Sequence, residues 1–258
     1  MIYKGDLMKT PARFLPSTLI FLTAMLLASP SFALTAREIM EKSDKLPQPK
    51  TTLSDVSMKI VTGKDAVDKE FTLQAMRLGK NDTRALITFT KPSKIKLLTH
   101  THPDREDDQW LMMTSGKAKR ITSSGKDKSF VNSHFCYEDL SSRKLDDYDY
   151  KLLAPKKVLG TDCHVVEAVR KKGVQVYDKV VLYVRTSDWF VLKVDFYKDG
   201  KYSKTLENFD IRTVDGIITP HRMVMTMADT SERTELTVRS VTYNGPMTAS
   251  TFNKEALR

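Results

Sequence analysis

Apolar residues recur at every second position over much of the chain. Met223, Met225 and Met227 show this spacing most clearly. Successive side chains of a β-strand point to opposite faces, so the spacing is typical of half-buried antiparallel strands. The same spacing predicts further strands at residues 56–60, 71–75, 85–89, 180–184 and 190–196.

Short turn sequences separate the predicted strands. They lie at residues 79–82, 186–188, 198–200 and 215–216, which are rich in residues that favour turns. Connections this short favour antiparallel neighbours, because parallel strands need long crossovers. A sheet of so many strands must curl or close, so we predict a mainly β fold built on a curled antiparallel sheet.

Helical patterns are predicted only near the ends of the mature chain. Thr35 and Glu38 have the spacing of a capping box, and Pro47 ends the helical pattern that follows them. Residues 251–257 are expected to form a last short helical turn. No repeat, linker or composition break in the sequence indicates a second domain after the leader.

The first 33 residues have the composition of a secretory signal peptide. Lys4, Lys9 and Arg13 form a basic start, and an apolar run and small residues at the cleavage positions follow. The apolar run is shorter than the ~20 residues that a membrane span needs, although an uncleaved anchor is the alternative. We predict a signal peptide at 1–33, a single mature domain at 34–258 and a periplasmic location.

The chain is strongly basic. Its formal net charge is +10, with 42 Lys and Arg against 32 Asp and Glu. In a secreted protein this favours contact with anionic lipid headgroups or an acidic protein partner, and not with nucleic acid. A solvated Lys-rich surface that keeps sheet edges from pairing would explain the same composition.

Residues 109–140 are the most distinctive part of the sequence. They predict two short strands, 110–114 and 117–122, then a polar loop and an aromatic cluster. This segment resembles the outer-membrane lipoprotein-sorting proteins of the LolA-like superfamily, and the order of predicted elements along the mature chain is similar to that family. The matching residues are Trp110, Leu111, Lys119, Arg120, Ile121, Ser129, Phe130, Ser133, Tyr137, Glu138, Asp139 and Leu140.

The resemblance implies an incomplete, unclosed β-barrel with an N-terminal helix and a helical, aromatic lid over a hydrophobic cavity. The resemblance also implies a carrier that shields acyl chains of lipoproteins or lipids on the way to the outer membrane. Relatives of this subtype are often associated with inner-membrane exporters of the RND (MMPL-like) type. We therefore expect a periplasmic acyl-chain carrier that contacts membrane surfaces transiently. The alternative is an accessory protein of such an exporter that carries no lipid.

Methionine is frequent on the predicted apolar face, and its flexible side chain adapts to varied apolar partners. The face therefore predicts a cavity lining, although gap-filling in a packed core is the alternative. The predicted lining residues are Met58, Ile60, Trp110, Met112, Phe190, Leu192, Val194, Phe196, Met223, Met225 and Met227. The predicted lid residues are Phe130, Phe135, Tyr137 and Leu140.

A group of basic residues is a candidate for a role near the lid. Lys117, Lys119, Arg120, Lys126 and Lys128 are expected to contact headgroups or a partner.

The two cysteines, Cys136 and Cys163, are expected either to form a disulfide that anchors the lid or to be buried thiols.

The sequence gives little support for catalysis. His100 and His102 would share a strand face near several carboxylates, but a solvated loop explains this stretch more simply than a metal site does. The sequence has no GxSxG, HExxH or Gly-rich phosphate loop. We therefore predict a protein that is not an enzyme and that has no metal and no cofactor.

Overall fold

Antiparallel strands make up most of the residues that the structure describes, as the alternating pattern predicts. The structure is a computed structural model that describes Met1, residues 34–171 and residues 176–257, so the predicted signal peptide lies outside the described residues. These residues contain one 13-stranded sheet. The strands are β1 (Thr51–Thr62), β2 (Asp65–Gly79), β3 (Asp82–Lys91), β4 (Lys96–His100), β5 (Asp108–Met112), β6 (Ala118–Ile121), β7 (Tyr148–Val158), β8 (Thr161–Arg170), β9 (Lys179–Arg185), β10 (Val191–Lys198), β11 (Lys201–Val214), β12 (Ile217–Met227) and β13 (Arg233–Tyr243).

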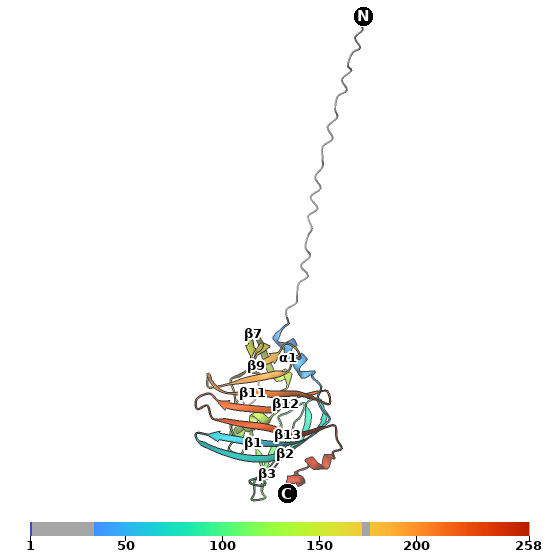
Figure 1. Ribbon diagram of the computed structural model, residues 1–258. Helices are drawn as coiled ribbons and strands as arrows, with labels where there is room; N and C mark the ends of the chain where they lie inside the picture. Colours follow the sequence, from blue (N-terminus) through green and yellow to red (C-terminus); the bar gives the residue numbers. More distant parts are fainter. Residues whose placement is uncertain (2–33, 172–175, 258) are drawn as a thin grey trace. The chain divides into compact units, whose positions relative to one another are not determined.

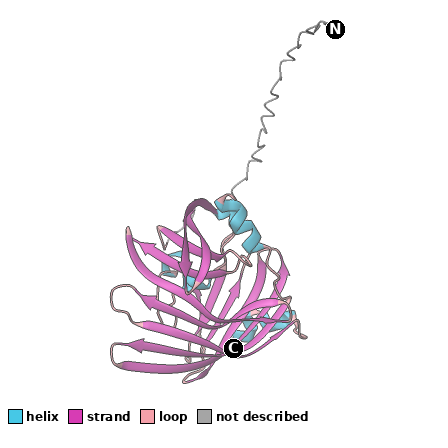
Figure 2. Cartoon of the chain, turned by 45° about the horizontal axis from the view of Figure 1, so that its top comes forward, coloured by secondary structure: helices cyan, strands magenta, loops and turns pink. Residues whose placement is uncertain are grey.

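The order of the strands leaves the sheet unclosed. Every ladder except one joins strands that are consecutive in the chain, and the exception pairs β1 with β13 in the middle of the sheet. Within the described residues β6 and β7 are the two edges and form no ladder with each other. The strands curl around a central space (Figures 1 and 2). The predicted fold, a mainly β, incomplete barrel, is confirmed.

The tight turns use residues with positive φ. Residues 199–200 and 215–216 form two-residue connections, as their Asp-Gly sequences predict. The β7–β8 connection at Leu159 and Gly160 has the same geometry, although its sequence gives a weaker signal. Leu159 has a φ of 48°, a region that leucine rarely occupies.

The predicted helix α1 spans Ala36–Asp44. Its capping box is present: the Glu38 amide donates to Thr35 Oγ1 (3.2 Å), and the Thr35 amide donates to Glu38 Oε2 (2.8 Å). Ile39 and Met40 are buried in the main core cluster, so α1 covers part of the sheet.

The two faces of the sheet carry separate apolar clusters. We call the face that bears the main core cluster the inner face; it includes Phe89, Leu97 and Val194. On the opposite, outer face, Leu86 and Leu98 belong to a cluster that the C-terminal segment covers.

That C-terminal segment consists of two 3-10 helices, η4 (Ala249–Phe252) and η5 (Lys254–Leu257), in agreement with the predicted helical turn. Phe252 and Leu257 are buried against the outer face of β3–β5.

The segment between the two edge strands passes through the interior. This segment, residues 122–147, is called the flap below. It contains three 3-10 helices, η1 (Ser123–Gly125), η2 (Tyr137–Leu140) and η3 (Leu145–Asp147). Its aromatic side chains are buried in the main core cluster, so the flap fills part of the space that the sheet encloses.

Candidate functional site

The inner face of the sheet borders a large hollow. This hollow, called the large compartment, has a volume of about 770 Å³. Aliphatic side chains from both halves of the sheet line it, together with Met40 of α1 and Leu140 of the flap. The aliphatic residues of its floor include Leu97, Val180, Leu182, Val191, Val194 and Leu206.

A second hollow lies beside the first. This small compartment has a volume of about 270 Å³ and is lined by β1, β2, β3, β12, β13 and the flap. Leu73, Ile87 and Leu140 line both compartments, so their side chains form a shared wall.

Aromatic contacts hold the flap in the interior. The ring of Phe130 lies 5.7 Å from that of Phe89 on β3 and 5.8 Å from that of Tyr137. Phe130 and Phe135 also line the small compartment. Phe130, Phe135 and Tyr137 are each no more than 6% exposed, so they act as a plug within the sheet and not as a surface cover.

A buried ion pair fixes the flap to β11. Lys204 Nζ lies 2.6 Å from Asp139 Oδ2, and the two side chains are 6% and 3% exposed. The hydroxyl of Tyr177 donates to Asp139 Oδ1 (2.7 Å), and the Cys136 amide donates to Oδ2 (2.8 Å). Burial, together with the charge of Asp139, raises the pKa of Tyr177 well above its usual range, so its phenol stays neutral and remains a donor.

His134 ties the flap to β13. Its backbone amide donates to the Thr234 hydroxyl (3.0 Å), and its Nδ1 lies 2.8 Å from the same oxygen. Burial lowers the pKa of His134 and outweighs the opposing effect of Glu232, whose carboxylate lies 3.7 Å away.

Polar side chains lie at the mouth of the large compartment. Arg77, Asn81, Thr83 and Thr101 line it at the end of the sheet where β2 turns into β3. The hollow is therefore amphipathic. Polar groups lie at this end and aliphatic residues form the floor, while Ser142 and Arg143 of the flap and Asn208 of β11 add further polar groups to the lining.

The structure brings several predicted lining residues to the two compartments. Phe190 and Val194 line the large compartment, and Met58 and Met223 line the small one. The predicted lid residue Leu140 lines both.

Other predicted lining residues lie on the inner face but are packed. Ile60, Phe196 and Met225 are at most 5% exposed within the main core cluster, so they are core residues. Met227 lines a separate hollow of about 230 Å³ beside His134.

Trp110 and Met112 face away from both compartments. They lie in the outer-face cluster with Phe252 and Leu257, whereas Leu111 between them packs against the main core. The prediction that Trp110 and Met112 share one strand face was correct, but their spacing does not show which face of the sheet is the inner one.

Leu192 also lies on the outer face, packed with Cys163 and Val165. The register of β10 shifts between Val191 and Lys193, and this irregularity separates Leu192 from Val194. A sequence pattern cannot place such a shift.

The predicted disulfide is absent. Cys136 and Cys163 are buried free thiols, in agreement with the alternative. Cys136 Sγ lies 3.2 Å from the Tyr177 hydroxyl in the interior, whereas Cys163 packs with Val165 and Leu192 in a separate cluster on the outer face. The two thiols are thus on opposite faces of the sheet, and burial raises the pKa of both.

The predicted basic residues do not form one surface. Lys126 is 5% exposed and pairs with Glu138 (3.8 Å), so it cannot serve as a headgroup contact. Arg120 pairs with Asp108. Lys117, Lys119 and Lys128 are exposed.

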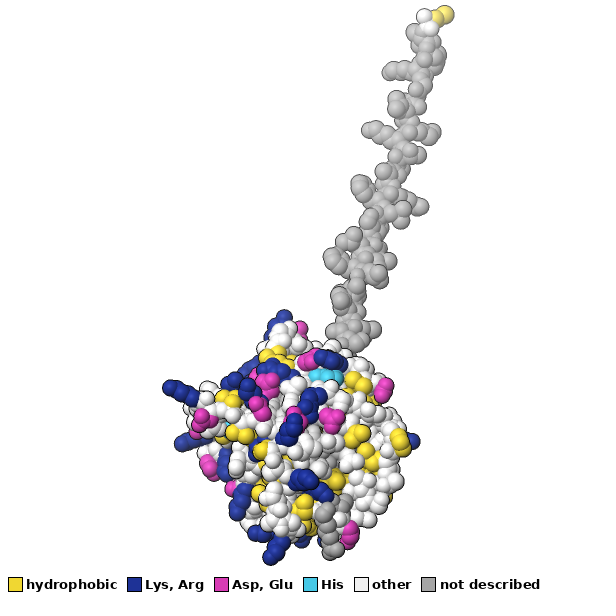
Figure 3. Space-filling view, turned by 60° about the horizontal axis from the view of Figure 1, so that its bottom comes forward, with side chains coloured by type: hydrophobic (Ala, Val, Ile, Leu, Met, Phe, Trp, Pro, Cys, Tyr) yellow, Lys and Arg dark blue, Asp and Glu magenta, His cyan; other side chains and the backbone are white. Residues whose placement is uncertain are grey.

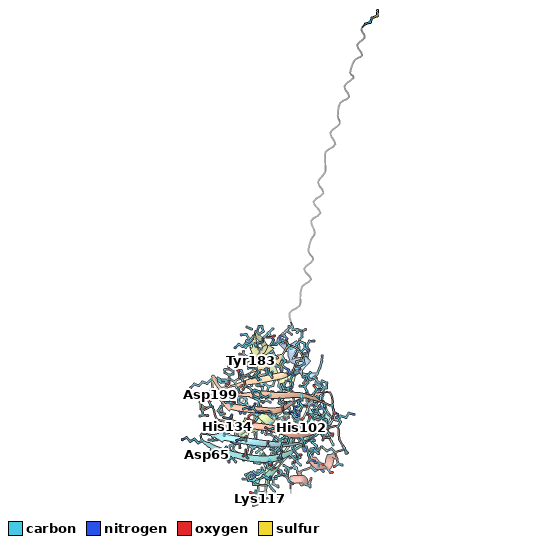
Figure 4. The ribbon with its side chains drawn as sticks, viewed as in Figure 1. Asp65, His102, Lys117, His134, Tyr183 and Asp199 are labelled. Atoms are coloured by element: carbon cyan, nitrogen blue, oxygen red, sulfur yellow. The ribbon has the colours of Figure 1, made fainter. Side chains whose placement is uncertain are left out.

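Lys117 lies at one extremity of the molecule, well apart from His134 of the flap (Figure 4). On the face in Figure 3, Lys and Arg side chains are interspersed with Asp and Glu.

Sequence reasoning missed two of the three residues of the shared wall, Leu73 and Ile87. Leu73 and Ile87 fall within predicted strands, at positions that alternate correctly, yet nothing in the pattern distinguishes them from ordinary core residues. Leu97 and Leu206 lie outside the strands predicted from the sequence and were also missed. A hollow depends on how strands far apart in sequence face each other.

Two other properties concern metal binding and membrane insertion. In residues 34–171 and 176–257, no group of three or more His, Cys, Asp or Glu side chains is arranged to hold a metal ion. No helix in the same part of the chain has the length and apolarity needed to cross a membrane. His102 instead lies 3.1 Å from Asp108.

Comparison with known proteins shows which solved structures share this fold. A crystal structure of an outer-membrane lipoprotein-sorting protein domain from Vibrio parahaemolyticus is 27% identical, with a TM-score of 0.80, and the match covers 86% of this chain and 97% of that one. A DUF1329 family protein from Desulfovibrio piger is 25% identical, with a TM-score of 0.82 and coverage of 86% and 98%. The resemblance to outer-membrane lipoprotein-sorting proteins is thereby confirmed.

The chain belongs to the family whose model matches residues 81–258 and is described as an uncharacterized protein. A LolA superfamily protein from Nitrosomonas europaea shares the fold at 22% identity, with a TM-score of 0.67 and coverage of 87% and 100%. No match was found among curated proteins.

Proposed function

We propose that the protein is a periplasmic carrier that binds acyl chains of lipoproteins or lipids and transfers them towards the outer membrane. The observation that carries this proposal is the large compartment, with its aliphatic floor and polar mouth. Its volume of about 770 Å³ lies within the range of ~300–1,000 Å³ that is common for small-molecule sites. In this proposal residues 1–33 are the leader and residues 34–258 the carrier domain.

The energetics of burial support an acyl ligand. Each CH₂ group removed from water contributes ~0.8 kcal/mol, so a long chain in the compartment would offset much of the cost of leaving a membrane. The name of the Vibrio parahaemolyticus relative, an outer-membrane lipoprotein-sorting protein domain, supports the same class of ligand. Such a carrier needs neither a catalytic group nor a cofactor.

A charge placed in the large compartment tests the proposal. Leu206 lines this compartment and is half-buried, so Leu206→Glu should leave the circular dichroism spectrum unchanged. The substitution should weaken binding of a fluorescent fatty acid at least about tenfold, or ~1.4 kcal/mol. The matched control is Leu53→Glu, because Leu53 is 45% exposed and lines neither compartment. Equal binding by wild type and Leu206→Glu would contradict the proposal.

An accessory role in an RND-type exporter leads to a different expectation. Mass spectrometry of protein purified from a periplasm would then detect no bound lipid, and an inner-membrane transporter would be recovered with the protein. Acyl lipids in wild type that are lost in Leu206→Glu would instead support the carrier.

A further inference from the structure

We propose that the large and small compartments hold the two acyl chains of one amphiphile, one chain on each side of the wall formed by Leu73, Ile87 and Leu140. This inference rests on the proposed acyl-binding function and specifies the ligand class, a lipid or lipid anchor with two chains.

The shared wall is the first observation behind this proposal. Leu73 and Ile87 are direct partners across the β2–β3 ladder, and Leu140 comes from η2 of the flap. All three side chains are aliphatic and line both hollows.

The large compartment changes from polar to apolar along its strands. On β3 the lining residues are Thr83, Ala85 and then Ile87, in order from the β2–β3 turn. On β4 and the residue that follows it, the corresponding order is Thr101, Thr99 and Leu97. A chain bound here would therefore have its polar end near the β2–β3 turn.

The lining of the small compartment also changes from polar to apolar along its strands. On β1 the lining residues are Thr52 and Ser54, followed by Val56 and Met58. Its polar end includes Tyr243, whose hydroxyl lies 2.8 Å from that of Thr219. Its apolar end is closed by aromatic side chains of the flap.

The ladder register places both polar ends at the same end of the sheet. Thr52 pairs with Tyr243 on one side and with Ala75 on the other. Ala75 is two residues from Arg77, which lines the mouth of the large compartment. A single headgroup at this end can thus be continuous with one chain in each compartment, because the two hollows share β2 and run side by side from it.

The stoichiometry of bound lipid tests the inference on the wild-type protein. Native mass spectrometry with phosphatidylglycerol, which has two chains, should give one molecule per protein. Lysophosphatidylglycerol, which has one chain, should give two. Saturation at a single lysophosphatidylglycerol molecule would overturn the inference, because the small compartment would then hold no chain.

Two substitutions, each of which enlarges a side chain in one compartment, test the two compartments separately. Val238 lines only the small compartment and Ala85 only the large one, and both are half-buried. Val238→Phe should reduce the lysophosphatidylglycerol count from two to one and weaken binding of phosphatidylglycerol about tenfold. Ala85→Phe should weaken binding of both lipids. Unchanged binding of phosphatidylglycerol by a folded Val238→Phe protein would count against the inference.

The possible failures are separable. If the wild type binds neither lipid, the proposed carrier function itself fails. If it binds phosphatidylglycerol and only one lysophosphatidylglycerol, the carrier function stands and the division into two chain sites fails. The wild-type stoichiometry decides this even if a filled variant does not fold.

Discussion

Asp139 is the residue on which the attachment of the flap depends most. Its carboxylate is buried with Lys204 and accepts hydrogen bonds from Tyr177 and the Cys136 amide. In Asp139→Asn the Lys204 ammonium would stay buried without a counter-charge. We expect a loss of about 3–5 kcal/mol in the free energy of unfolding, measured by urea denaturation.

The double variant Asp139→Asn/Lys204→Met separates the ion pair from its surroundings. It removes both charges, so it should recover most of the stability that the single variant loses. If the double variant is as unstable as Asp139→Asn, the cost does not come from an unpaired ammonium.

Leu159 carries backbone strain in an exposed turn. Its φ of 48° lies in a left-handed region that Asn tolerates better, and Asn-Gly is the preferred pair for this two-residue hairpin turn. Leu159→Asn should therefore raise the free energy of unfolding by about 1 kcal/mol. Leu152→Asn is the control, since Leu152 is similarly exposed on the same hairpin but has an ordinary φ; a similar gain there would exclude strain relief as the cause.

At the scale of elements, we expect the stability of the flap to depend on pH through His134. Burial holds the pKa of His134 below its ordinary value of about 6.5, although Glu232 opposes this; Lys204 nearby acts in the same direction as burial. The unfolded chain therefore takes up a proton at a higher pH than the folded chain does. Stability is fully present above about pH 6.5 and falls as the pH decreases towards the folded pKa.

Urea denaturation between about pH 7.5 and pH 5.5 measures this dependence. His134→Gln keeps a hydrogen-bonding side chain but does not titrate, so its stability should change less over the same interval. An identical pH dependence in wild type and variant would assign the effect to other groups.

The strands and their turns were largely predictable because they depend on local patterns. Alternation in β12 and the Asp-Gly turns both follow from a few neighbouring residues. Which face is inner depends on distant strands, and so Trp110 and Met112 were assigned to the wrong face. The shift in β10 that moves Leu192 to the outer face has no local signal.

At the scale of the whole molecule, the sequence predicted an open barrel with a lid over one cavity, but neither the interior position of the flap nor the division into two compartments. The predicted resemblance to outer-membrane lipoprotein-sorting proteins was correct. The compartments arise because the flap enters the space between distant strands and divides it at Leu140. No spacing rule encodes that division, since it depends on the three-dimensional meeting of β2, β3 and η2.

The pairing of β1 with β13 also bears on how the chain folds. The Ser54 hydroxyl donates to the Ser240 carbonyl across 186 residues, whereas every other ladder joins consecutive strands. Closing so long a loop costs more chain entropy, so this ladder should form after the rate-limiting step. Val56→Ala in β1 should then speed unfolding and leave the refolding rate nearly unchanged in stopped-flow experiments, whereas Val166→Ala in the β8–β9 hairpin should slow refolding. Until the β1–β13 ladder forms, β1 and β13 would present two unpaired strand edges. Aggregation during refolding should therefore start at these two edges.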